Sequence, residues 1–134
     1  MAIVIVLAIA LQSALAPGSW EITSRADIGT RPDLPPAAAA ALRRAVAAPK
    51  RSRRCLVAGA ALAEALSGAE CQASDVRLAA GRAALQHQCG DTAGRLTGPV
   101  TATSFQLAGV VRAPGTTAPP MTLVIAGRRV ASQC

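Results

Sequence analysis

Alternation of apolar and polar side chains is the clearest periodic pattern in this chain, and it occupies residues 19–28. One side of the alternation carries the apolar residues Trp20, Ile22, Ala26 and Ile28. The other side carries the polar residues Glu21, Thr23, Arg25 and Asp27. A period of two residues is typical of a strand that is buried on one face only. We therefore expect a half-buried β-strand to open the folded part of the chain.

Two helical segments are expected after that strand. Residues 29–36 contain a glycine and three prolines and predict a loop, and Pro36 is suited to the first position of an alanine-rich helix that runs to about Ala48. Residues 56–67 predict a second short helix, with Gly68 as its C-terminal stop.

The remainder of the chain is expected to form antiparallel strands with short turns. In an antiparallel pair, facing residues have a constant sum of positions. A turn at Ala80-Gly81 then places Val76 opposite Leu85 and Leu78 opposite Ala83. A second turn at Thr103-Ser104 places Val100 opposite Leu107 and Ala102 opposite Phe105. After a loop from Ala113 to Pro120, a last strand has Met121, Leu123 and Ile125 on one face.

These elements predict an α+β fold. Its centre is an antiparallel β-meander of about six strands in a curved sheet, with one or two short helices inserted after the first strand. Gly98-Pro99 is a place where a bulge or an edge would bend the sheet. We expect one domain over residues 17–134, in which residues 29–54 are a Pro-, Ala- and Arg-rich insertion.

The N-terminal segment resembles a secretion signal. Residues 1–11 have no polar side chain, and small residues at Ala14 and Ala16 form an A-x-A cleavage pattern. A permanent membrane anchor is the weaker alternative, because Pro17-Gly18 ends the segment before the roughly 20 apolar residues that a spanning helix needs. Residues 1–16 are therefore expected to be a signal peptide for export to the periplasm. The exact cut is left open, because proline is unfavourable just after a cleavage site.

Composition makes covalent cross-links important. Hydrophobic residues are 51% of the 134 residues but aromatic residues only 1%, so the core lacks the large buried areas that aromatic rings supply. Small exported domains often compensate with disulfides. The four cysteines at 55, 71, 89 and 134 contain no C-x-x-C pair, which favours disulfides over a zinc site. Four cysteines allow three pairings. The strand order favours Cys71 with Cys89 and Cys55 with Cys134, and no metal or cofactor is expected.

The net charge of +7 comes almost entirely from arginine. Its densest part is a cluster without acidic residues, formed by Arg43, Arg44, Lys50, Arg51, Arg53 and Arg54. The simplest interpretation is a solvated linker. The alternative is an anion-binding segment that contacts phosphate groups of an envelope component. No aromatic side chain is interleaved for base stacking, so no specific nucleic acid partner is expected.

Several of these features occur together in one known family. The chain has Gly18-Ser19-Trp20-Glu21 after the signal, the four cysteines in their order, and a last strand with Gly127-Arg128-Arg129 before Cys134. In this order the chain resembles DUF3617, a domain-of-unknown-function family of small periplasmic proteins of Gram-negative bacteria. The resemblance implies a compartment and a shape, and it implies no activity.

Catalytic residues are not expected. His87 is the only histidine, and on the strand pattern it shares a face with Leu85 and Cys89, which favours a buried structural role. We therefore expect a monomeric, non-enzymatic binding or envelope-associated protein whose curved sheet holds a small apolar ligand. Two alternatives stay open: a peripheral binder of anionic envelope surfaces through residues 43–54, and an unrecognised enzyme that uses His87.

Overall fold

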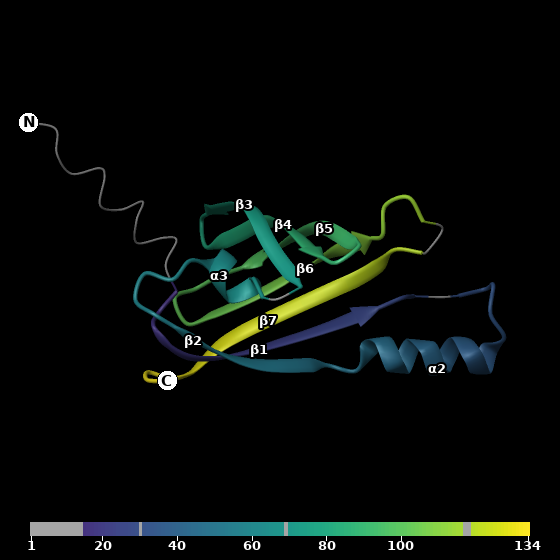
Figure 1. Cartoon of the computed structure of the whole chain (residues 1–134), viewed down its shortest axis with the longest axis horizontal. Helices are drawn as coiled ribbons and strands as arrows, with labels where there is room; N and C mark the ends of the chain where they lie inside the picture. The colour runs from purple at the N-terminus through teal and green to yellow at the C-terminus, as the bar shows by residue number, and fades with distance from the viewer. Residues whose placement is uncertain (1–14, 30, 69, 117–118) are drawn as a thin grey trace, which may run out of the picture.

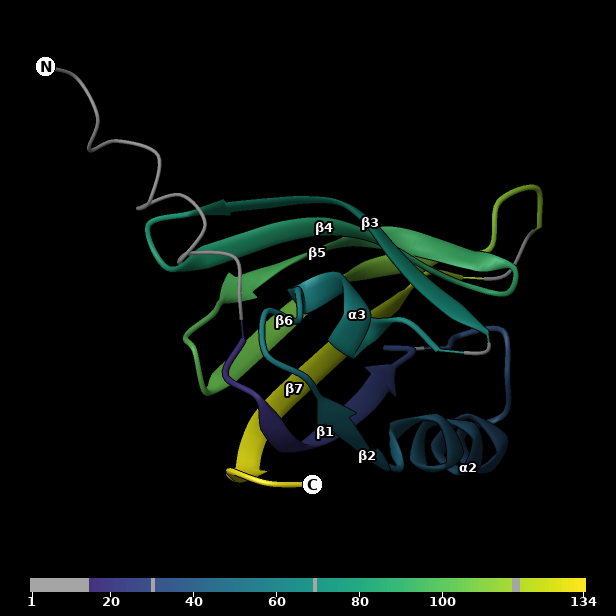
Figure 2. The ribbon, with the colours of Figure 1, turned by 60° about the vertical axis from the view of Figure 1, so that its left-hand side comes forward.

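A seven-stranded antiparallel sheet dominates the computed structural model, which describes residues 15–29, 31–68, 70–116 and 119–134 (Figure 1). In spatial order the strands are β2, β1, β7, β6, β5, β4 and β3. Their bounds are β1 Gly18–Asp27, β2 Lys50–Leu56, β3 Cys71–Ala79, β4 Arg82–Cys89, β5 Thr92–Pro99, β6 Ser104–Arg112 and β7 Met121–Ala131. Helix α2 spans Pro36–Ala47, and helix α3 spans Leu62–Leu66. The sheet curls into a half-barrel, with α3 lying in its concavity (Figure 2).

The expected meander is present, since β3 to β7 are neighbours in sequence order. The strand count was too low by one. Residues 50–56, interpreted as a linker and the start of a helix, form the edge strand β2, which pairs with β1 from Ser24↔Lys50 to Gly18↔Leu56. The segment Lys-Arg-Ser-Arg-Arg-Cys-Leu has too few apolar residues to show a period of two. Its strand conformation comes from tertiary pairing with the free edge of β1.

The two helices differ in how well the sequence predicted them. The alanine-rich helix begins at Pro36 as expected and ends one residue early. The second helix was expected over 56–67 but covers only Leu62–Leu66. Residues 57–60 form a turn instead, in which Ala60 N donates to Val57 O and Gly59 has a φ of +83°. That left-handed conformation interrupts a helix and is favourable for glycine.

The predicted strand registers were right at one hairpin and wrong at another. Leu78 pairs with Ala83 across the Ala80-Gly81 turn as expected. The other expected pair, Val76 with Leu85, is not formed, because Val76 lies in a bulge between Ser74 and Arg77. At the other hairpin Val100 pairs with Phe105, two positions from the predicted partner Leu107. The reason is a wider turn: Thr101 Oγ1 accepts hydrogen bonds from the backbone N–H groups of Thr103 and Ser104. A shift of two residues keeps the same side chains on the core face.

Trp20 and Phe105 form the centre of the core with their rings stacked, at a centroid distance of 6.0 Å. Gly127 lies against the Phe105 ring, and a methyl group in its place would overlap that ring. Trp20 Nε1 donates to Ala16 O (2.9 Å), and Arg129 Nε donates to Pro17 O (2.7 Å). The tryptophan near the start of the domain and the Gly-Arg-Arg near its end are therefore parts of one structural unit.

Both favoured disulfides are present, Cys55–Cys134 and Cys71–Cys89. Cys55–Cys134 ties the edge strand β2 to the C-terminal residue, and Cys71–Cys89 joins directly paired residues of β3 and β4. Disulfides that close loops of 79 and 18 residues restrict the unfolded chain by about 4.5 and about 3 kcal/mol in the chain-entropy description. They are a large part of the stability available to a core with few aromatic residues.

Most of the expected signal peptide, residues 1–14, lies outside the described residues. Leu15 and Ala16 are described: the Leu15 side chain is buried in the core, and their backbone N–H groups donate to Ala60 O and Ala102 O. A cut after Ala16 would remove these contacts, so the boundary at residue 16 stays a prediction. Within the described part of the chain, no helix is long and apolar enough to cross a membrane.

Candidate ligand-binding groove

The concave face of the sheet has two halves that differ in how they are covered. In the half that we call the closed half, α3 and the preceding turn cover the sheet, and the large side chains are fully buried: Trp20, Leu62, Leu85, Leu96 and Leu107. In the other, the open half, a groove with a volume of about 610 Å³ lies over the sheet. A volume of this size is in the range of small-molecule sites in proteins.

The floor of the groove is apolar because the inward positions of β1, β6 and β7 meet there. These residues are Ile22, Ala26, Val111, Met121, Leu123 and Ile125. Met121 and Leu123 are only partly buried. The expectation that Met121, Leu123 and Ile125 share one face is therefore confirmed, and that face lies under the groove rather than under a covering helix.

One wall of the groove belongs to β2, whose inward side chains are Lys50, Ser52 and Arg54. The guanidinium of Arg54 is engaged: its Nη1 donates to the backbone oxygens of Ala65 and Ser67 at the end of α3. The ammonium group of Lys50 forms no hydrogen bond or ion pair with the described residues. It also borders a second cavity of about 350 Å³, which shares Ser24, Ala26, Met121 and Leu123 with the groove and extends toward α2. Lys50 is thus a cation at the junction of two apolar spaces.

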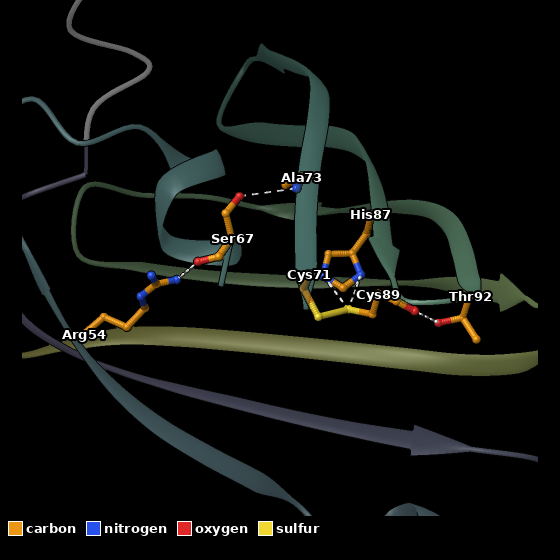
Figure 3. Close-up of a disulfide and its surroundings, with 7 residues drawn as sticks. All are labelled: Arg54, Ser67, Cys71, Ala73, His87, Cys89 and Thr92. Atoms are coloured by element: carbon orange, nitrogen blue, oxygen red, sulfur yellow. Dashed lines mark hydrogen bonds between the residues drawn. A yellow bond between two sulfur atoms is a disulfide. The ribbon is translucent and has the colours of Figure 1, made fainter. Parts of the chain in front are cut away.

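The opposite wall contains the Cys71–Cys89 disulfide and His87 (Figure 3). Next to it, Ser67 Oγ donates to Ala63 O and accepts from Ala73 N, which fixes the link between α3 and β3. Since Arg54 also contacts Ser67, the two walls are connected through the end of α3.

His87 is 4% exposed, and its two ring nitrogens lie 3.6 and 3.7 Å from Cys89 Sγ. Burial lowers the pKa of His87 below its ordinary value of 6.5, so the ring is neutral at neutral pH. In the described part of the chain, neither a carboxylate nor a hydroxyl is hydrogen-bonded to this ring. An acid-base triad around His87 would need such partners. The buried position expected for His87 is confirmed.

The structure divides the predicted anion-binding cluster among several places. Arg43 donates to Gly29 O and holds the loop before α2. Arg54 and Lys50 are on the groove side of β2, and Arg51 and Arg53 alternate onto its other side, where they are exposed. Arg44 is exposed in the last turn of α2. The six cations therefore do not form one continuous patch.

Sequence reasoning missed the part of the groove that β2 provides. The inward positions of Lys50, Ser52 and Arg54 follow from a strand that the polar sequence does not indicate. A usable signal was present, because residues 50–54 lack the glycine and proline that a linker of this length commonly contains.

A smaller cavity of about 230 Å³ lies elsewhere, beside the β3–β4 turn. It is bordered by Leu15, Leu62, Leu78 and Val100, together with the turn residues 79–82. Leu15 belongs to the segment expected to be a signal peptide, so a cut after Ala16 would remove one border of this cavity.

Comparison with protein families gives one match. The model of the family described as "Protein of unknown function (DUF3617)" matches residues 15–134, nearly the whole chain and all of its strands. No curated protein and no solved structure matches the chain. With its tryptophan, four cysteines and Gly-Arg-Arg ending joined in one curled sheet, the chain belongs to the DUF3617 family.

Proposed function

We propose that this protein is an exported, non-enzymatic binding protein of the periplasm, whose groove takes a small amphiphile with an apolar body and an anionic head. The single observation that carries the proposal is the open half of the concave face. An apolar floor that the fold itself leaves uncovered is a common feature of small-molecule sites. The two disulfides support it, since they suit a domain that works in an oxidising compartment.

The anionic head is inferred from Lys50. The apolar floor favours a hydrocarbon body, and the ammonium group of Lys50 stands at the border of that floor without a carboxylate partner among the described residues. An anion there would gain a charge-assisted contact with Lys50 at the rim of the groove. A long-chain carboxylate is the simplest ligand of this chemistry.

Displacement of a fluorescent probe tests this proposal. Dansyl-labelled undecanoate would be titrated into the protein, and decanoate and decanol would then compete with it. We expect both to displace the probe from the wild type, with decanoate the stronger competitor. Lys50→Ala should weaken decanoate about three- to tenfold and leave decanol unchanged, because one exposed charge contact contributes roughly 1 kcal/mol.

Arg51→Ala is the matched control, since Arg51 is the next residue of β2 and is on the other side of the sheet. It should leave both competitors unaffected. Equal loss of decanoate binding in the two variants would show that net charge, not the groove, attracts the ligand. Failure of the wild type to bind the probe would remove the proposal.

Export has its own test. The protein would be expressed with its complete N-terminal segment, recovered from the periplasmic fraction and weighed intact. The proposal predicts a mass that lacks the signal and four thiol hydrogens. Retention of the full-length mass in the cytoplasmic fraction would contradict it.

A second candidate function, binding to anionic envelope surfaces through residues 43–54, is favoured by one observation. Arg51 and Arg53 are both exposed on the side of β2 that faces away from the groove. Sedimentation with phosphatidylglycerol vesicles would test it, with the double variant Arg51→Gln and Arg53→Gln. The charge-matched control is Arg77→Gln and Arg82→Gln, on β3 and β4 at the far end of the strand order. Equal vesicle binding by both variants would remove this function.

A further inference from the structure

Two cysteines and a histidine meet at one point of the groove wall. The Sγ atoms of Cys71 and Cys89 and a ring nitrogen of His87 all lie within 4.8 Å of one another. Figure 3 shows the ring of His87 directed toward the disulfide. In the oxidised protein the two sulfur atoms are bonded to each other and are not available as thiolates.

Backbone pairing places these three side chains independently of the S–S bond. Cys71 and Cys89 are cross-strand partners, and His87 comes two residues before Cys89 on the same strand, so it points to the same face. The pairs Gln72↔Gln88 and Ala73↔His87 continue the ladder on one side. On the other side Gly90 N donates to Glu70 O, and Thr92 Oγ1 donates to Cys89 O. Breaking the disulfide would therefore leave the three positions side by side.

We propose that the reduced β3–β4 hairpin is a binding site for a thiophilic d10 cation, Zn²⁺ or Cu⁺, with Cys71, Cys89 and His87 as its ligands. Reduction of the Cys71–Cys89 disulfide uses two electrons and two protons from an external dithiol, which is oxidised to a disulfide. Binding of the cation then releases the two thiol protons, because the thiolate is the ligand. This site is separate from amphiphile binding, which concerns the oxidised protein.

The donor set suits such a cation. Two thiolates and an imidazole form a soft combination that selects Zn²⁺ or Cu⁺ over Mg²⁺ and Ca²⁺. Tetrahedral bonds of about 2.0 to 2.3 Å place neighbouring ligand atoms roughly 3.5 Å apart, so atoms already within 4.8 Å need only small side-chain rotations. The groove borders all three residues and leaves space for a fourth, exogenous ligand.

His87 can bind a cation without losing a strong hydrogen bond. The only hydrogen-bonding contact of its ring among the described residues is with Cys89 Sγ, and a sulfur atom is a weak acceptor. A metal bond at one ring nitrogen would replace that weak contact without disrupting another. Its 4% exposure means that the ligand atom is held in the wall rather than on a mobile surface chain.

The test is titration of the reduced protein with Zn²⁺, followed by native mass spectrometry, and with Co²⁺, followed by its thiolate charge-transfer absorption. We expect one equivalent of Zn²⁺ on the reduced wild type and none on the oxidised protein. Cys71→Ser with Cys89→Ser should abolish binding. His87→Gln should weaken it at least tenfold. Cys55→Ser with Cys134→Ser should retain it, because that pair lies at the sheet edge.

Several results would overturn the proposal. The first is that the reduced wild type binds no Zn²⁺. The second is that the substitutions of Cys55 and Cys134, rather than those of Cys71 and Cys89, abolish binding. The third is that His87→Gln leaves the affinity unchanged. If reduction alone unfolds the sheet, added Zn²⁺ must restore its far-ultraviolet circular dichroism in the wild type and not in His87→Gln, since a cation that binds the folded state stabilises it. Absence of that restoration would equally reject the site.

Discussion

Both halves of the concave face present apolar side chains of the sheet, yet only one half is filled. Under α3, Leu96 and Leu107 are fully buried beside the Trp20–Phe105 pair. Beyond α3, Leu123 and Met121 lie under a groove of about 610 Å³. The closed half therefore supplies the packing that holds the sheet together. The open half presents apolar surface that folding does not use.

Truncation of a leucine in each half gives the largest expected contrast. Leu107→Ala should lower the free energy of unfolding by about 3 to 5 kcal/mol, because it leaves a cavity in a closely packed region. Leu123→Ala should lower it by only about 1 kcal/mol, because its side chain already borders open space. Urea unfolding monitored by Trp20 fluorescence measures both. Equal losses would show that the two halves contribute alike to stability.

Larger side chains should also have different effects in the two halves. Gly127→Ala should destabilise the protein by about 1 to 3 kcal/mol, since the new methyl group would overlap the Phe105 ring. Ala26→Phe places a much larger side chain in the floor of the groove and should change the free energy of unfolding by no more than about 0.5 kcal/mol. Thermal unfolding of the two variants measures both effects. If Ala26→Phe lowers the melting temperature more than Gly127→Ala does, the open half is filled in the folded protein.

The pH dependence of stability should show a smaller effect from the wall of the open half. Burial lowers the pKa of His87 in the folded state, so the unfolded chain takes up a proton first as the pH falls. The free energy of unfolding therefore has its full value above about pH 6.5 and decreases as the pH falls toward the lowered pKa of His87 in the folded state. Urea unfolding at about pH 7.5 and about pH 5.5 should therefore show a decrease.

His87→Gln is the comparison for that measurement, because it removes the titrating group and leaves the carboxylates in place. The variant should lose less stability than the wild type between the two pH values. An identical decrease in both proteins would assign the pH dependence to other groups.

Local patterns in the sequence predicted much of the sheet, and they failed where tertiary contacts decide. Alternating residues located β1 and β7, and turn chemistry located the β3–β4 hairpin. The edge strand β2 was missed because nearly all of its side chains are polar, so its conformation depends on pairing with β1. The register of the β5–β6 hairpin was missed because one hydroxyl, that of Thr101, widens the turn.

The groove was predictable only in part. A curved sheet with an apolar concave face followed from the strand pattern, and so did the expectation of a ligand in that concavity. Its boundaries did not follow, because one wall is the unpredicted strand β2 and the other depends on how short α3 is. A helix over the full expected range 56–67 would have been much longer than α3, which has only five residues.

The most direct test of the open half as a binding site is titration of dansyl-labelled undecanoate into the wild type, Ala26→Phe and Ala108→Phe. Ala26 lies in the groove floor, whereas Ala108 is exposed on the opposite face of the sheet and controls for the added ring. We predict saturable binding of one probe to the wild type and to Ala108→Phe, and at least a tenfold loss of affinity in Ala26→Phe. Equal binding by all three proteins, or by none, would show that the open half is not a ligand-binding groove.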